Sequence, residues 1–372
     1  MKEKMNMRPS RVGAVALAVV GSVAVSACGS SSKTTSGSSD PGSSASGTLN
    51  GAGSTFAAPI YQQWGSNLKS QGLTVNYNAV GSGTGVADLQ TATADFAGDD
   101  GQLAAADKSG MKGPVLQFPV AFGAITVSYN LPGVKSGLKL DGPTTANIFS
   151  GKIKTWNDPA IKALNPGVSL PSTSITVAHR SDSSGTTEGF TTYLSDVSPS
   201  WKSSIGADKI VKWPTGTGGK GNAGVAAIVK QTQGAVGYVE QAYAIENGFT
   251  YASVKNSAGK YIAPSLPATS AAAVGVPVPS DLGISTLNSK NPAAYPIASQ
   301  TFIDVYKDVC KNGGASSGTA KALKSFLSYA FGAGQSTLGS GGSQIPYAPL
   351  TSALKAKDNA QLSKLSCNGS PA

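Results

Sequence analysis

The sequence predicts an α/β fold with mostly parallel sheets, because segments of strand periodicity alternate along the chain with segments of helical periodicity. Glycine- and serine-rich turns separate several of these strands from the helix that follows. The chain has 372 residues, which is long enough for two domains that each bury a core. Charged residues make up only 13% of it and glycine is abundant, which favours a loop-rich globular protein over a coiled coil or a charged disordered chain.

The first segment, 1–27, has the features of a secretory signal peptide. A basic start precedes an apolar run over 12–25 that is short for a membrane span. The sequence Val-Ser-Ala-Cys at its end resembles a bacterial lipobox, so we expect Cys28 to carry lipid and become the new N-terminus. A plain thiol near a cleavage site is the alternative. Serine and glycine then dominate, which predicts a flexible tether over 28–48.

The next segment, 51–64, predicts a glycine-rich turn followed by a helix. Ile60, Trp64 and Leu68 fall four residues apart, on one face of that helix. The residues at 54–56 therefore occupy the helix start, where backbone N–H groups have no intrahelical partner.

The same order of strand, small-residue turn and helix follows at once. Alternation over 73–77 predicts a strand, and the glycine-rich turn at 81–85 places Ser82 at the start of another helix. A short apolar stretch then ends in two adjacent carboxylates, Asp99 and Asp100.

The middle of the chain begins with a nearly continuous apolar and β-branched run over 114–130. This run predicts a buried strand or a crossing between domains. A turn with a short helix is predicted over 141–156, and a second helix restarts at 157. Alternation over 174–178 predicts a half-buried strand.

The stretch 179–190, HRSDSSGTTEGF, places a helix start directly after that strand. Ser184 occupies a favoured N-cap position, and the N–H groups that follow it lack intrahelical partners. The positive end of the helix dipole and the nearby Arg180 suit a small tetrahedral oxyanion. An ordinary capped helix is the alternative interpretation of this stretch.

The remaining segments follow from composition and periodicity. They are a glycine-rich loop at 216–222, a helix over 225–231, a strand over 234–239, a poorly periodic stretch over 256–294, a strand over 295–306, and helices near 320–331 and 348–365.

Two further patterns match those of nucleotide-binding or catalytic sites only in part. Gly216-x-Gly218-x-x-Gly221 matches a dinucleotide-binding pattern, but no clean strand precedes it and no acidic residue lies about 20 positions later. His179, Asp182 and Ser184 are the ingredients of a nucleophilic triad, but they lie close together along the chain, without a GxSxG elbow. A hydrolase therefore stays an alternative rather than the preferred function.

Three helix starts, at Thr55, Ser82 and Ser184, share small polar residues. If they converge, their N–H and hydroxyl groups replace much of the water around a desolvated oxyanion. Asp100 beside such an anion would be repulsive unless the anion brings a proton, as phosphate does near neutral pH and sulfate does not. Separate local caps and an exposed carboxylate are the alternatives.

Cysteine usage fits an exported protein. Besides Cys28, only Cys310 and Cys367 are present, and we expect them to form a disulfide that contributes about 4 kcal/mol. Two separated cysteines and the single His179 do not make a metal-ligand set, and we expect neither a metal nor a cofactor.

Several segments together resemble the phosphate-binding protein of the high-affinity phosphate ABC transporter, in that family's order over most of 49–310. They are GAGSTFAAP, GSGTG, ADFAGDD, RSDSSGTT, GKIKTWNDPAIKALNPG, GGKGNAGVAAIV and GAVGYVEQAYA. The resemblance implies a type II periplasmic-binding-protein fold with a crossover hinge. It implies one lobe from 49–126 and 298–372, and the other from 127–297.

The resemblance also implies a phosphate site and a transport role without catalysis. It assigns the ligand groups to Thr55, Phe56, Ser82, Asp100, Arg180, Ser184, Gly185 and Thr186, and it assigns Asp182 to orienting the arginine. The implied protein is a receptor on the outer face of the cytoplasmic membrane, or in a periplasm, that delivers phosphate to permease subunits and binds no nucleic acid. Asp99, His179 and the part after Cys310 depart from the family pattern. A sulfate or molybdate receptor, and an adhesin with a degenerate pocket, are the competing interpretations.

Overall fold

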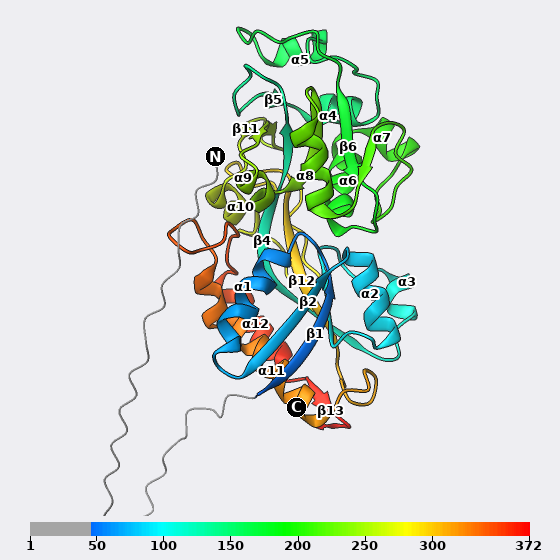
Figure 1. The fold of residues 1–372 in the computed structure, drawn as a ribbon, viewed down its shortest axis with the longest axis vertical. Helices are drawn as coiled ribbons and strands as arrows, with labels where there is room; N and C mark the ends of the chain where they lie inside the picture. The colour runs from blue at the N-terminus through cyan, green and yellow to red at the C-terminus, as the bar shows by residue number, and fades with distance from the viewer. Residues whose placement is uncertain (1–45) are drawn as a thin grey trace, which may run out of the picture. The chain divides into compact units, whose positions relative to one another are not determined.

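The computed structural model describes residues 46–372, which form a mixed β-sheet with helices packed on it (Figure 1). The predicted signal peptide, Cys28 and most of the predicted tether lie outside the described residues. Strand β1 (Gly47–Gly53) includes the last two residues of the tether expected over 28–48. No helix within 46–372 is long and apolar enough to cross a membrane.

The main sheet has nine strands, in the order β2-β1-β3-β12-β4-β8-β6-β7, with β9 paired to β4. Besides β1, these strands are β2 (Leu73–Ala79), β3 (Phe96–Asp99), β4 (Val115–Tyr129), β6 (Thr176–Arg180), β7 (Thr217–Gly219), β8 (Ala235–Glu240), β9 (Thr250–Tyr251) and β12 (Ala298–Tyr306). β1 is parallel to β2 and β3, and β6 is parallel to β7 and β8. β12 and β4 are antiparallel to their neighbours, so the sheet is mixed rather than mostly parallel.

The long strand β4 makes the sheet mixed, because it pairs antiparallel with one neighbour along its first part and with another along its last part. Its first part, 115–124, pairs with β12, and its last part, 125–129, pairs with β8. β4 therefore leads out of a first lobe, built on β1, β2, β3 and β12, into a second lobe built on β6, β7 and β8. β12 runs in the opposite direction beside β4, as Figure 1 shows. The apolar run over 114–130, predicted to be a buried strand or a crossing, is thus a buried strand that runs from one group of strands to the other.

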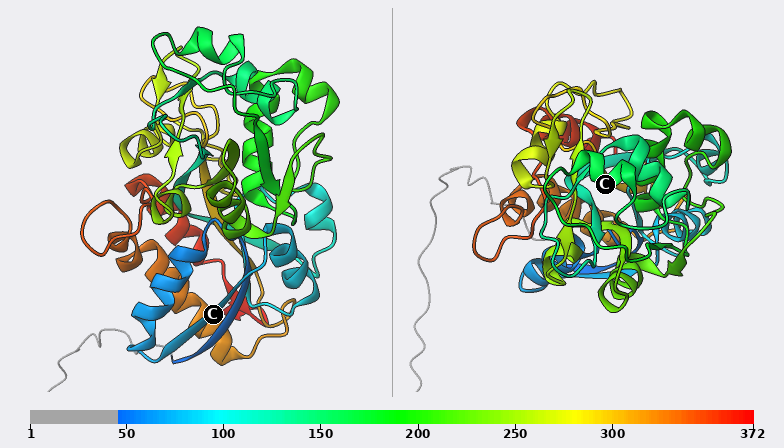
Figure 2. Two further views of the ribbon diagram at one scale, coloured as in Figure 1. Left: turned by 45° about the horizontal axis from the view of Figure 1, so that its top comes forward. Right: turned by 90° about the horizontal axis from the view of Figure 1, so that it is seen from above.

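The helices divide between these two lobes (Figures 1 and 2). The first lobe carries α1 (Ala58–Lys69), α2 (Ser82–Thr91), α3 (Ala105–Ser109), α11 (Ser317–Phe331), the 3₁₀ helix Ala333–Thr337 and α12 (Ser352–Leu362). The second carries α4 (Gly142–Phe149), α5 (Pro159–Leu164), α6 (Gly185–Val197), α7 (Pro199–Ser204), α8 (Gly221–Gln231), α9 (Gln241–Glu246) and α10 (Leu266–Ala272). Short strands complete the fold: β5 (Lys139–Leu140), β10 (Ser253–Lys255), β11 (Tyr261–Ile262), β13 (Ser366–Cys367) and β14 (Ser370–Pro371).

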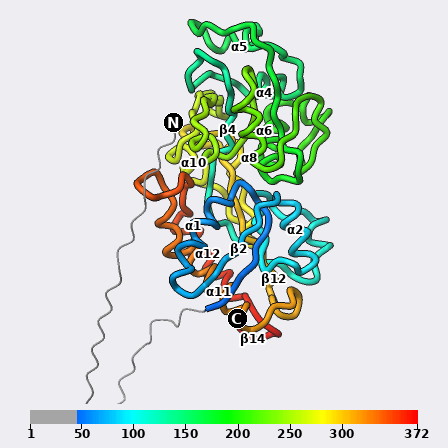
Figure 3. The backbone as a smooth tube through the Cα atoms, viewed as in Figure 1, coloured from blue at the N-terminus to red at the C-terminus, as the bar shows by residue number. Residues whose placement is uncertain are grey.

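The C-terminal segment returns to the first lobe, where Figure 3 shows it beside the N-terminal strands. Phe326 of α11 packs against Trp64 of α1 and Phe96 of β3, with ring centroids 6.3 and 5.1 Å away. A disulfide joins Cys310 to Cys367 across 57 positions of sequence and holds β13 beside the end of β12. The first and last parts of the described range 46–372 thus share one core.

A second aromatic cluster supports the strand that carries Arg180. Phe190 of α6 stacks on Tyr238 of β8, with ring centroids 4.5 Å apart. The Tyr238 hydroxyl accepts a hydrogen bond from the Arg180 backbone N–H at 3.0 Å and lies 2.6 Å from Thr187 Oγ1. The end of β6 and the start of α6 are therefore fixed to the same core.

Candidate functional site

The loop between β1 and α1 presents two backbone N–H groups between the lobes. The carbonyl of Thr55 accepts a hydrogen bond from Tyr243 at 2.8 Å, and the carbonyl of Phe56 accepts one from Tyr347 at 2.5 Å. Within residues 46–372, no group accepts a hydrogen bond from the N–H of either residue. Both carbonyls are thus occupied, whereas both N–H groups are available to an acceptor.

Asp100, at the end of β3, is a buried carboxylate solvated by hydroxyls. Ser54 Oγ lies 2.6 and 2.7 Å from its two oxygens, Thr301 Oγ1 donates at 2.8 Å, and Ser82 Oγ lies at 3.4 Å. The side chain is only 2% exposed. Burial raises the pKa of Asp100 to about 7, although the hydrogen bonds from Ser54 and Thr301 act in the opposite direction.

Arg180, at the end of β6, is 3% exposed and held in a fixed orientation. Its Nε donates to Asp182 Oδ1 at 2.7 Å, and its Nη2 donates to Asp182 Oδ2. Burial alone would raise the pKa of Asp182, but the guanidinium lowers it, so the carboxylate stays ionised. Nη1 lies 3.3 Å from Thr186 Oγ1. Asp182 thus has the contacts of a residue that orients the arginine.

The start of α6 is capped as its sequence predicts. Ser184 Oγ accepts a hydrogen bond from the Thr187 N–H at 3.1 Å. Among the residues that the structure describes, none accepts from the N–H of Gly185 or Thr186. These two donors lie at the positive end of the helix dipole, which favours an anion there.

The structure brings these groups from both lobes together. A Cβ atom added at Gly185 would lie 2.7 Å from both Asp100 Cβ and Ser82 Oγ. The Gly83 N–H, in the first turn of α2, donates to the Ser183 carbonyl at 3.2 Å. Glycine at 185 is therefore required sterically, because a side chain there would push the lobes apart.

A buried asparagine links the remaining members of the site. Asn222 Nδ2 donates to Thr55 Oγ1 at 2.9 Å and to Thr186 Oγ1 at 3.3 Å. Thr186 in turn contacts Arg180. All eight residues expected to bind the ligand thus lie on segments that meet at one place between the lobes.

Sequence reasoning missed three polar side chains of this site. Ser54 lies in the glycine-rich motif before α1, but only its neighbours Thr55 and Phe56 were expected to bind. Asn222 ends the glycine-rich loop 216–222, whose pattern points only to nucleotides. Thr301 lies inside a strand with no local signal, and it reaches Asp100 from 201 positions away.

The residues of the alternative catalytic triad are engaged in separate contacts. Ser184 caps α6, and Asp182 binds Arg180. The His179 ring stacks on Trp213, with centroids 4.9 Å apart, and its Nδ1 lies 3.0 Å from the Arg180 carbonyl oxygen. This arrangement disfavours a hydrolase. Across 46–372, no His, Cys, Asp or Glu side chains are grouped to hold a metal ion.

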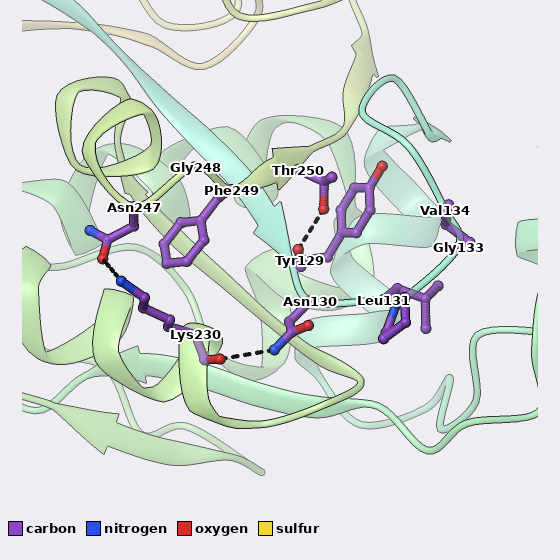
Figure 4. A pocket seen from close by; sticks show the side chains of 11 residues that line it. Tyr129, Asn130, Leu131, Gly133, Val134, Lys230, Asn247, Gly248, Phe249 and Thr250 are labelled. Atoms are coloured by element: carbon purple, nitrogen blue, oxygen red, sulfur yellow. Dashed lines mark hydrogen bonds between the residues drawn. The ribbon is translucent and has the colours of Figure 1, made fainter.

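A separate hollow of about 340 Å³ lies at the end of β4, away from these residues (Figure 4). Lys230 Nζ lies 3.5 Å from Asn247 Oδ1 there, and Thr250 Oγ1 donates to the Tyr129 carbonyl at 2.7 Å. The lining contains none of the residues expected to bind the anion.

Comparison with known proteins assigns the chain to a family. Residues 38–333 match the model of the PBP superfamily domain. The chain is 41% identical to the phosphate-binding protein PstS of Pasteurella multocida (strain Pm70), over 84% of this chain and 89% of that protein. It is 39% identical to PstS of Xylella fastidiosa (strain 9a5c), over 81% of each.

A solved structure shares the fold at low sequence identity. A high-affinity periplasmic phosphate-binding protein, PfluDING, solved bound with phosphate, superposes with a TM-score of 0.67 at 21% identity, covering 87% of this chain and 99% of that one. Because its identity is low, this likeness concerns the fold alone. The similarity in sequence and the shared fold agree, and this chain belongs to the PstS family of phosphate-binding proteins.

Proposed function

We propose that this chain is an extracytoplasmic receptor that binds one inorganic phosphate ion between its lobes and delivers it to an ABC permease for import. The observation that carries this proposal is the composition of the site. Unpartnered N–H groups and one guanidinium surround a place that also contains a single hydroxyl-solvated carboxylate, Asp100. The family's name and the phosphate-bound structural relative support the same ligand.

The donors supply the binding energy and Asp100 supplies the selectivity. The N–H groups of Thr55, Phe56, Gly185 and Thr186 bind phosphate oxygens, and Arg180 compensates the charge. The hydroxyls of Thr55, Ser82, Ser184 and Thr186 complete the set of ligand groups. Asp100 accepts a hydrogen bond from the protonated phosphate oxygen, which a fully deprotonated sulfate lacks.

Closure of the lobes is part of the proposed mechanism. The first lobe, 49–126 with 298–372, contributes the residues from Thr55 to Asp100, and the second, 127–297, contributes the residues from Arg180 onward. A ligand that contacts both lobes stabilises the closed arrangement over the open one. In this proposal the signal peptide over 1–27 is cleaved, and a lipid on Cys28 then anchors the protein to the membrane.

Calorimetric titration with inorganic phosphate tests the proposal. The parent protein should show one tight site, and sulfate should not compete. Arg180→Ala removes the charge-compensating group and leaves Asp182 unpaired, so phosphate affinity should fall by about 1,000-fold. Lys230→Ala removes a positive charge from the remote hollow and serves as the matched control. Unchanged affinity in Arg180→Ala would refute the assignment.

A further inference from the structure

Asn222 is a buried residue whose four hydrogen bonds connect both lobes. It lies in the first turn of α8 and is fully buried. Its backbone N–H donates to Thr55 Oγ1 at 3.1 Å, and its Nδ2 donates to the same oxygen at 2.9 Å and to Thr186 Oγ1 at 3.3 Å. Its Oδ1 accepts from the Glu240 backbone N–H at 2.9 Å.

The Glu240 contact determines which way the Asn222 amide faces. A backbone N–H can only donate, so it must meet the carbonyl oxygen of the side chain. The NH₂ group is then the one that faces the two threonines. The protein backbone thus fixes Asn222 as a donor toward the site.

This orientation determines what both threonine hydroxyls can do. A hydroxyl has two acceptor positions and one hydrogen to donate. Thr55 Oγ1 already accepts from the backbone N–H and the Nδ2 of Asn222, and Thr186 Oγ1 accepts from Arg180 Nη1 and Asn222 Nδ2. Both acceptor positions on each oxygen are occupied, so only the hydrogens remain. No residue within 46–372 receives a hydrogen bond from either hydroxyl.

We infer that Asn222 is a positioning residue that makes Thr55 and Thr186 obligatory hydrogen-bond donors and thereby determines the proton pattern of the ligand. This inference rests on the proposed function. Oxygens that face the two threonines must be unprotonated acceptors, because a protonated oxygen would meet a second hydrogen. The ligand's proton is directed to Asp100, the carboxylate of the site that is free to accept it. Asn222 therefore contributes to selectivity without touching the ligand.

Asn222→Asp reverses the polarity at nearly constant shape. The new carboxylate would accept hydrogen bonds from both threonine hydroxyls and turn their lone pairs toward the anion. Phosphate affinity, measured by calorimetry, should fall by about 100-fold. Asn247→Asp makes the same change in the remote hollow and should leave the affinity at the parent value. Parent-like affinity in Asn222→Asp would overturn the inference.

A double-mutant cycle separates this role from a merely structural one. In the parent, Thr55→Val should weaken phosphate binding by about tenfold. In the Asn222→Ala background, where the hydroxyl is no longer committed to donating, the same change should cost no more than about threefold. An equal loss of phosphate affinity on Thr55→Val in both backgrounds would refute the coupling between Asn222 and Thr55, even if both proteins bind phosphate weakly.

Two further measurements test the inference if the Asn222 variant does not fold. If Asn222→Ala does not fold, as judged by circular dichroism, Thr55→Ser and Thr55→Val are compared in the parent background. The serine variant keeps the donor and should stay within about threefold of the parent, whereas equal loss in both variants would contradict the inference. Absence of phosphate binding by the parent protein would instead refute the proposed function itself.

Discussion

Two adjacent carboxylates at the end of β3, Asp99 and Asp100, have opposite surroundings. Both are buried, at 0% and 2% exposure. Asp99 Oδ2 lies 2.7 Å from Lys209 Nζ, whereas Asp100 contacts three hydroxyls. A cation beside Asp100 would compete with a ligand for that carboxylate. One strand end thus holds a carboxylate paired with a lysine next to a carboxylate that contacts only hydroxyls, and in the proposed function the second of these selects the ligand.

The Asp99 region joins the lobes without a ligand. Lys209 belongs to the second lobe, and its Nζ also lies 3.5 Å from Asp107. Burial alone would lower the pKa of Lys209, but Asp99 raises it, so the amine stays protonated. The buried ion pair is therefore a direct electrostatic link across the site. Asp99, which departs from the family pattern, has this structural partner.

Among changes at these two carboxylates and their partners, Asp100→Asn should have the strongest effect, and that effect is on selectivity. The neutral amide removes the repulsion that excludes sulfate, so the preference for phosphate over sulfate should fall by at least about 100-fold. Competition calorimetry measures this ratio. Asp95→Asn, in the turn before β3, is the matched control. The interpretation of Asp100 fails if sulfate still does not compete in the variant.

The next effect concerns the ion pair across the lobes. Lys209→Met leaves Asp99 buried without its partner, and phosphate affinity should fall by about tenfold through faster dissociation. Stopped-flow measurement of phosphate release tests this. Lys212→Met, at a nearby exposed lysine, is the control. The double variant Asp99→Asn with Lys209→Met should recover part of the loss, and no recovery would contradict a direct link.

A third prediction concerns how the free energy of unfolding depends on pH through buried carboxyl groups of the two regions. Burial raises the pKa of Asp100 to about 7 and that of Glu188, near the Lys209 pair, to about 8. The folded protein therefore keeps protons that the unfolded chain releases from about pH 4 upward. The two protonated carboxyl groups therefore contribute most to the free energy of unfolding at about pH 4 and below. This contribution is lost as the pH rises through 7 to 8.

Urea unfolding without phosphate at pH 5 and pH 8 measures this dependence. The free energy of unfolding should be lower at pH 8, and Glu188→Gln should reduce the difference by about 1 kcal/mol or more. A difference that is unchanged in Glu188→Gln would show that this carboxyl does not titrate in the range.

The smallest expected effect comes from one of the three hydroxyls at Asp100. Thr301→Val removes a single donor from the carboxylate, so phosphate affinity should fall by about threefold, measured by calorimetry. Thr286→Val, at another fully buried threonine, is the control. A loss as large as that of Arg180→Ala would mean that Thr301 does more than solvate Asp100.

Local sequence patterns predict those parts of the site that lie within a few residues of one another. Ser184 caps the helix that its position predicts, and Asp182 holds Arg180 from two residues away. Strand and helix periodicity indicated the α/β class and the crossing over 114–130. These features depend on neighbouring residues, whose backbone geometry is set within a few positions.

The contacts between groups that are distant in sequence follow from the tertiary fold. Lys209 reaches Asp99 from 110 positions away, and Thr301 reaches Asp100 from 201. Asn222 contacts Thr55 across 167 positions. No local pattern encodes such pairs, because they follow from β4 and β12 running in opposite directions between the lobes. That antiparallel pair also makes the sheet mixed, and it brings the end of β3 against the start of α6.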